Sequence, residues 1–103
     1  MRKEQIGSKQ AWMYYHNDFE VLVSYDTPVA GFIPHGVGYV KTEEYYSKTT
    51  SRHINYYLKY PIFPTKVKVK FLREMFSAML KDTLKELILP DGLRYKNLLG
   101  KEV

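Results

Sequence analysis

The sequence predicts an α+β fold, in which a small antiparallel sheet of about four strands is followed by a short helix and a longer C-terminal helix packed on the sheet. Two observations predict it. Residues 10–42 consist of short aromatic and β-branched runs separated by turn residues, whereas the apolar residues after position 50 recur with helical spacing. The chain has 103 residues, the size of one domain.

The first nine residues carry little hydrophobic content, so we expect a flexible tail over residues 1–9 and a single α+β domain over residues 10–103. Strands are predicted at residues 11–15, 19–25, 29–33 and 37–41. The short connections between them are typical of an antiparallel meander. Within residues 19–25 the odd positions are apolar or aromatic, which predicts a strand with one buried face.

After the strands the period changes to that of helices. Thr49, Thr50 and Ser51 are possible N-caps for a short helix over residues 52–59, which Pro61 and Pro64 would end. Residues 66–70 alternate Lys and Val, and are either a short edge strand or the extended entry to the next helix. That longer helix is predicted from its apolar stripe, which comprises Leu72, Met75, Phe76, Met79, Leu80, Leu84, Leu87 and Ile88.

Composition narrows the class of protein. Hydrophobic residues make up 45% of the chain and charged residues 26%, which is an ordinary globular balance. The absence of cysteine excludes disulfides and thiolate metal sites. No apolar run has the length of a membrane span, and the first residues lack the pattern of a signal peptide. We therefore expect a soluble protein of the cytoplasm that does not act at a membrane.

No residue pattern predicts catalysis. His16, His35 and His53 lack the close spacing of a metal-binding pair, and the carboxylates are not arranged as a general acid and base. The sequence also lacks a nucleophile elbow and a phosphate-binding loop. We therefore predict that the protein is not an enzyme and that it has no catalytic, metal-binding or cofactor-binding residues.

Positive charge is concentrated in the middle of the chain. The net charge is +5, yet residues 45–73 contain seven Lys or Arg and no Asp or Glu, so the rest of the chain is slightly acidic. Five tyrosines lie in the same stretch. Such a segment attracts anionic partners. The candidate binding residues are Lys48, Arg52, Tyr56, Lys59, Tyr60, Lys66, Lys68 and Lys70.

Three interpretations of this basic, aromatic segment remain open. Lys and Arg can neutralise phosphates while exposed tyrosines stack on unpaired bases, which would make it a nucleic-acid contact. Tyr and Arg are also favoured anchors of protein interfaces. The third interpretation is a solvated helix face whose hydroxyl groups serve only as caps.

Two strings of residues resemble a known group of proteins. Residues 24–30 (SYDTPVA) and residues 45–58 (YYSKTTSRHINYYL) are similar to a family of small uncharacterised proteins from phages and plasmids of Gram-positive bacteria. The similarity covers roughly residues 20–60. It implies a mobile-element origin and supplies no activity or site residues. Both strings also have a structural explanation, as a turn and a helix start.

The expected function is that of a small non-enzymatic binding protein of phage or mobile-element type. It would inhibit a host defence or nucleic-acid-handling protein, as anti-CRISPR and anti-restriction proteins do, by occupying a functional surface. Its partner would be a host protein or a protein–nucleic-acid complex, with direct DNA or RNA contact also open. The alternative is an accessory protein that binds nucleic acid directly in phage replication or transcription control. The long apolar stripe also permits a homodimer.

Overall fold

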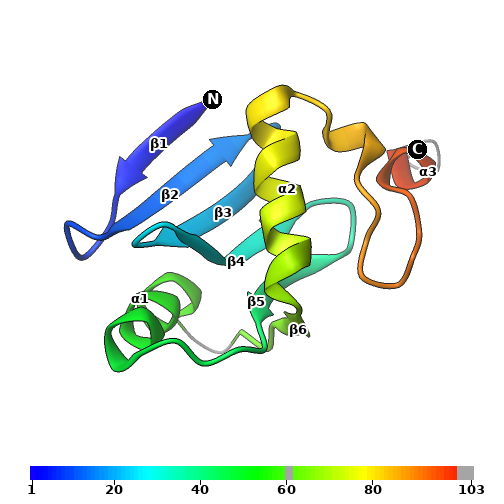
Figure 1. Cartoon of the computed structure of the whole chain (residues 1–103). Helices are drawn as coiled ribbons and strands as arrows, with labels where there is room; N and C mark the ends of the chain where they lie inside the picture. The colour runs from blue at the N-terminus through cyan, green and yellow to red at the C-terminus, as the bar shows by residue number, and fades with distance from the viewer. Residues whose placement is uncertain (60–61, 100–103) are drawn as a thin grey trace.

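Six strands form one sheet whose spatial order follows the chain, β1-β2-β3-β4-β5-β6 (Figure 1). The computed structural model describes residues 1–59 and 62–99. The strands are β1 (Arg2–Gln5), β2 (Ala11–His16), β3 (Phe19–Ser24), β4 (Thr27–Ile33), β5 (Gly38–Thr42) and β6 (Thr65–Val67). Neighbours from β1 to β5 are antiparallel, and β6 runs parallel to β5. The α+β class and the four predicted strands are confirmed, and the sheet has two strands more than predicted.

The first additional strand lies where the sequence predicted a flexible tail. Arg2 pairs with Tyr15 and Gln5 with Trp12, so residues 2–5 form an ordered edge strand instead. The side chains of β1 are exposed, which is why the segment has no hydrophobic signal. The Arg2 guanidinium lies 4.3 Å from the centre of the Tyr15 ring, and the Lys3 ammonium 5.1 Å from that of Trp12. Aromatic residues of β2 thus give β1 a surface to pack on.

Residues 66–70 combine the two structures that the sequence left open. Thr65–Val67 forms β6, in which Val67 is buried, and Val69 begins helix α2 (Val69–Lys81) two residues later. Helix α1 (Lys48–Leu58) lies between β5 and β6 in the chain, so the parallel pairing of these strands follows from a helical crossover.

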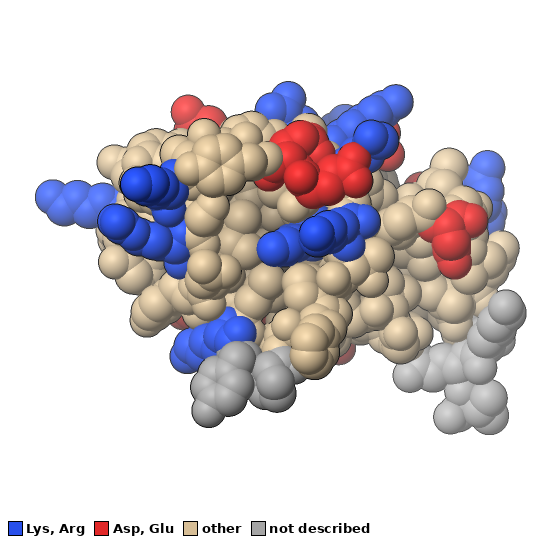
Figure 2. All heavy atoms as spheres, turned by 90° about the horizontal axis from the view of Figure 1, so that it is seen from below, with Lys and Arg blue, Asp and Glu red and all other residues tan. Residues whose placement is uncertain are grey.

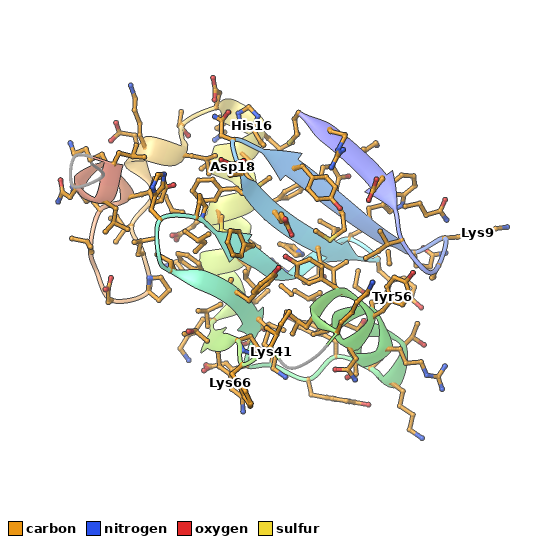
Figure 3. The ribbon with its side chains drawn as sticks, turned by 180° about the vertical axis from the view of Figure 1, so that it is seen from behind. Lys9, His16, Asp18, Lys41, Tyr56 and Lys66 are labelled. Atoms are coloured by element: carbon orange, nitrogen blue, oxygen red, sulfur yellow. The ribbon has the colours of Figure 1, made fainter. Side chains whose placement is uncertain are left out.

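The two helices lie on opposite faces of the sheet. Figure 1 shows α2 crossing one face, and Figure 3, from behind, shows α1 in front of the other. The cluster under α2 includes Val21 and Ile33 of the sheet, and the cluster under α1 includes Leu22 and Val29. The central strand β3 is therefore buried on both faces, rather than on the one that its alternating pattern predicted. Leu22 and Ser24 are buried because α1 covers them.

Helix α2 approaches β4 closely at Gly31. A side-chain carbon at this position would collide with the carbonyl oxygen of Glu20 and would lie 2.8 Å from the Met75 methyl group. Only a residue without a side chain lets strand β4 lie so close to β3 and α2.

The long helix is shorter than predicted. It ends at Lys81, because Asp82 adopts the left-handed conformation (φ 57°) and the Thr83 N–H donates to the carbonyl of Ala78. The Asp82 carboxylate also lies 2.8 Å from His16 Nε2 at the end of β2. A short 3-10 turn (Leu84–Glu86) and helix α3 (Tyr95–Leu99) follow. Leu84 and Leu87 still reach the core, but Leu80 and Ile88 are about half exposed, contrary to the predicted stripe.

Candidate binding surface

Helix α1 begins at Lys48 and its N-cap is Ser47. The Ser47 hydroxyl oxygen accepts a hydrogen bond from the Thr50 N–H at 3.0 Å, which satisfies one of the free donors of the first turn. The helix therefore starts four residues before the predicted position, and Thr49, Thr50 and Ser51 lie inside it. Thr50 and His53 lie on the side of the helix that faces the sheet, where both are buried.

Apolar and polar contacts hold α1 on the sheet. Ile54 and Leu58 are buried against the sheet. The Tyr57 hydroxyl donates to the Glu20 carboxylate of β3 at 2.9 Å, and burial together with this carboxylate raises the pKa of Tyr57 far above its ordinary range. The orientation of α1 about its own axis is thereby fixed.

The opposite side of α1 carries four of the candidate residues. Lys48, Arg52, Tyr56 and Lys59 are all exposed, and we call them the α1 surface. The Lys59 ammonium lies 5.7 Å from the centre of the Tyr56 ring, so these two candidates contact each other. Within the part of the chain that the structure describes, none of the three cations of the α1 surface forms an ion pair. Tyr60 lies outside the described residues.

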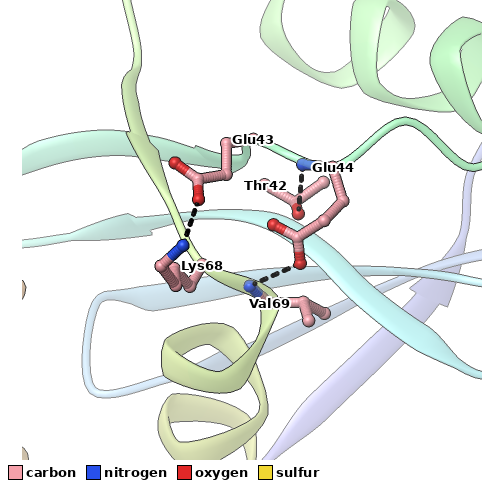
Figure 4. Close-up of polar contacts among 5 residues, drawn as sticks. All are labelled: Thr42, Glu43, Glu44, Lys68 and Val69. Carbon is pink, nitrogen blue, oxygen red and sulfur yellow. Dashed lines mark hydrogen bonds and ion pairs between the residues drawn. The ribbon is translucent and has the colours of Figure 1, made fainter.

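The three lysines that follow α1 do not join this surface. Lys68 is paired with Glu43 at 2.8 Å, an ion pair that raises the pKa of Lys68, and Glu44 accepts from the N–H of Val69 at the start of α2 (Figure 4). Lys70 borders a groove of about 560 Å³ along α2, on the other face of the sheet. The prediction placed these lysines in one binding surface with Arg52 and Lys59 because they are close in sequence, but in the fold they lie apart from the α1 surface.

Lys66 has a different neighbour. It is the register partner of Lys41 in the parallel pair β5–β6, and the two lysines lie together at this edge of the sheet (Figure 3). Figure 2 shows that Lys and Arg side chains on the underside stand in separate groups, with Asp and Glu side chains among them. The basic stretch of the sequence is therefore several small basic areas in space.

A cavity of about 340 Å³ lies beside the α1 surface. Its walls are the β1–β2 loop, through Ile6, Gly7 and Ser8, and α1, through residues that include Arg52 and Tyr56. Gly7 lies against the Tyr56 ring, since a side-chain carbon there would be 3.6 Å from it. Sequence reasoning missed the loop because it assigned residues 1–9 to a tail. Lys9 projects from the same loop (Figure 3).

His53 is buried between the cavity and the core. Its Nδ1 lies 2.8 Å from the Ser24 hydroxyl, which lies 3.0 Å from the Thr50 hydroxyl, and burial lowers the pKa of His53. Ser24 is only 2% exposed, so its hydroxyl has no path to a substrate. The sequence offered no signal for this group, because its members come from β3 and α1.

Over residues 1–59 and 62–99 there is no group of three or more His, Asp or Glu residues that could hold a metal ion. In the same ranges, no helix has the length and apolar character to cross a membrane.

The chain matches a protein-family model. No curated protein and no solved structure matches the chain. A family model described as a family of unknown function (DUF8033) matches residues 1–71. The match includes all six strands and α1 and stops just inside α2. It therefore covers the α1 surface and the cavity beside it, and the chain belongs to this family of unknown function.

Proposed function

We propose that this chain is a small binding protein without catalytic activity, of phage or mobile-element type. It acts in the cytoplasm of a bacterial host and covers a functional surface of a host defence or nucleic-acid-handling protein. The observation that carries the proposal is the α1 surface, where Lys48, Arg52 and the exposed Tyr56 share one side of the helix and Lys59 follows at its C-terminal end.

The physical properties of this surface favour an anionic protein face as the partner. Its cations are not neutralised by ion pairs within the described residues, so their field is available to steer an acidic partner. Tyr56 is 55% exposed and flanked by Arg52 and Lys59, a composition typical of interface anchors. The apolar side of α1 is fixed on the sheet, so the helix backbone that carries this surface is already ordered before binding.

Affinity capture with paired variants tests the proposal. Wild-type protein is compared with the double variant Arg52→Glu, Lys59→Glu in capture from a lysate of a Gram-positive host, with and without nuclease. The control is Lys85→Glu, Lys96→Glu, which makes the same change of charge at exposed positions away from α1. We expect the α1 variant to lose a nuclease-resistant protein that the control retains. Equal capture by both variants would place the binding surface elsewhere.

Direct binding of nucleic acid is the second candidate. It is favoured by three exposed tyrosines on or just before α1, since Tyr45 is 73% exposed, Tyr46 42% and Tyr56 55%. Such rings can stack on unpaired bases at about 1–3 kcal/mol per base. In this case fluorescence anisotropy with a single-stranded oligonucleotide should show binding whose affinity falls steeply with salt, and whose salt slope becomes shallower in the α1 variant.

A further inference from the structure

The cavity beside the α1 surface is lined in part by His53, and one ring nitrogen of this residue forms no hydrogen bond among the described residues. His53 is 6% exposed, and its Nδ1 is engaged by Ser24. No hydrogen bond to its other nitrogen, Nε2, is present among the described residues, yet the described residues include no buried side-chain nitrogen or oxygen without a partner. Solvent therefore reaches Nε2. Because His53 lines the cavity, we infer that Nε2 opens into it.

The cavity combines apolar walls with a polar end. Ile6, Gly7 and the Tyr56 ring supply the apolar side, and Ser8, Thr49, Arg52 and His53 supply hydroxyl, guanidinium and imidazole groups. Its volume of about 340 Å³ accommodates one side chain or a small molecule. An occupant that fits has an apolar stem and a compact polar head.

The charges around the cavity favour a single negative charge on that head. Of the described residues that line the cavity, Arg52 alone carries a formal positive charge, and a guanidinium can donate two parallel hydrogen bonds to a carboxylate. The lowered pKa of His53 has burial as its cause, without a contribution from a nearby carboxylate. The Ser24 and Thr50 hydroxyls can each donate or accept, so they can support the ring when Nε2 carries the proton.

We propose that this cavity binds the carboxylate side chain of an Asp or Glu residue of the protein partner, between the Arg52 guanidinium and His53 Nε2. The inference rests on the proposed function, because it names the group that the α1 surface recognises. A phosphodiester of nucleic acid suits the site less well, since it is bonded to a sugar on both sides and would bring those sugars against the apolar walls. A carboxylate on a short methylene stem places its apolar part there instead.

A probe titration followed by NMR tests the site without the partner. The full chain is titrated with N-acetyl-glutamate amide, and its neutral isostere N-acetyl-glutamine amide is the matched ligand control. We expect the glutamate probe to shift the His53 ring signals saturably, with a millimolar dissociation constant, and to raise the pKa of His53. Arg52→Gln should weaken this binding about tenfold or more, whereas Lys96→Gln, on helix α3 and outside the cavity wall, should not.

Each other outcome overturns the proposal. Equal shifts with both probes would mean that charge is not recognised. Shifts with oligothymidine but not with the glutamate probe would assign the cavity to nucleic acid, and shifts with inorganic phosphate alone would assign it to a free phosphate. No shift at His53 with any probe would leave the cavity without the proposed role. If the Arg52→Glu, Lys59→Glu variant still loses the protein partner in that case, the proposed function stands and only the carboxylate site fails.

Discussion

The Ser24 hydroxyl of β3 lies 2.8 Å from Nδ1 of His53 on α1, and both side chains are buried. This contact joins two residues that are 29 positions apart in the chain. It fixes the depth at which α1 sits on the sheet, and it turns the second nitrogen of His53 toward the cavity. The stability of the fold and the chemistry of the candidate site are coupled at this point.

The first prediction concerns the dependence of stability on pH. Because burial lowers the pKa of His53 from its ordinary value of 6.5, the unfolded chain binds this proton more readily than the folded one. The stability that depends on neutral His53 is fully present above pH 6.5 and is lost as the pH falls through the lower pKa of the folded state. Urea unfolding between pH 7.5 and pH 5 should show this loss in the wild type. His53→Gln should show less of it, and parallel pH profiles would contradict the prediction.

The second prediction compares two positions of α2. Met75 is fully buried and Leu80 is 55% exposed, although both belong to the stripe predicted from the sequence. Met75→Ala should lower the free energy of unfolding by about 2–5 kcal/mol, because it leaves a cavity in the core. Leu80→Ala and Leu80→Asp should each change it by less than about 1 kcal/mol. Urea denaturation measures both, and a large loss in the Leu80 variants would indicate that α2 is rotated from its position here.

The third prediction tests whether β1 is paired in solution. The Tyr15 hydroxyl donates to the Glu4 carboxylate at 3.0 Å, and burial and this carboxylate raise the pKa of Tyr15 to about 12. Glu4→Gln should lower this pKa toward its ordinary value of 10.0 without reaching it, because burial remains. NMR of ring-labelled tyrosine measures the change, with Glu43→Gln as control. An unchanged pKa in Glu4→Gln would mean that β1 does not hold Glu4 beside Tyr15.

The fourth prediction compares how much two contacts contribute to stability. They are made by Glu43 and Glu44, which follow β5. Glu44 accepts from the Val69 N–H at the start of α2, where a carboxylate satisfies a free donor and complements the helix dipole. Glu44→Ala should therefore cost about 0.5–2 kcal/mol in urea denaturation. The Glu43–Lys68 pair is exposed, with 42% and 80% of the two side chains accessible, so Lys68→Ala should leave the melting temperature unchanged. A larger loss from Lys68→Ala than from Glu44→Ala would reverse this order.

The sequence by itself determined the elements whose local pattern is strong. Four strands follow from alternating or β-branched runs between turn residues, and α1 follows from the change to helical spacing after position 50. The sequence also indicated Arg52, Tyr56 and Lys59 as candidate binding residues, and all three are exposed. These features depend on residues close together in the chain. The spacing of apolar residues in the sequence therefore indicates whether a segment is a strand or a helix.

Tertiary structure alone decided the features that join distant residues. Strand β1 has exposed side chains, and its place is set by pairing with β2. Helix α2 ends at Lys81, and the next residue, Asp82, contacts His16 at the end of β2. The lysines of the basic stretch are separated in space. Lys68 forms an ion pair with Glu43, and Lys70 lies on the face of the sheet opposite α1. The cavity exists because the β1–β2 loop lies against Tyr56, and composition and period carry no information about contacts between segments so far apart in sequence.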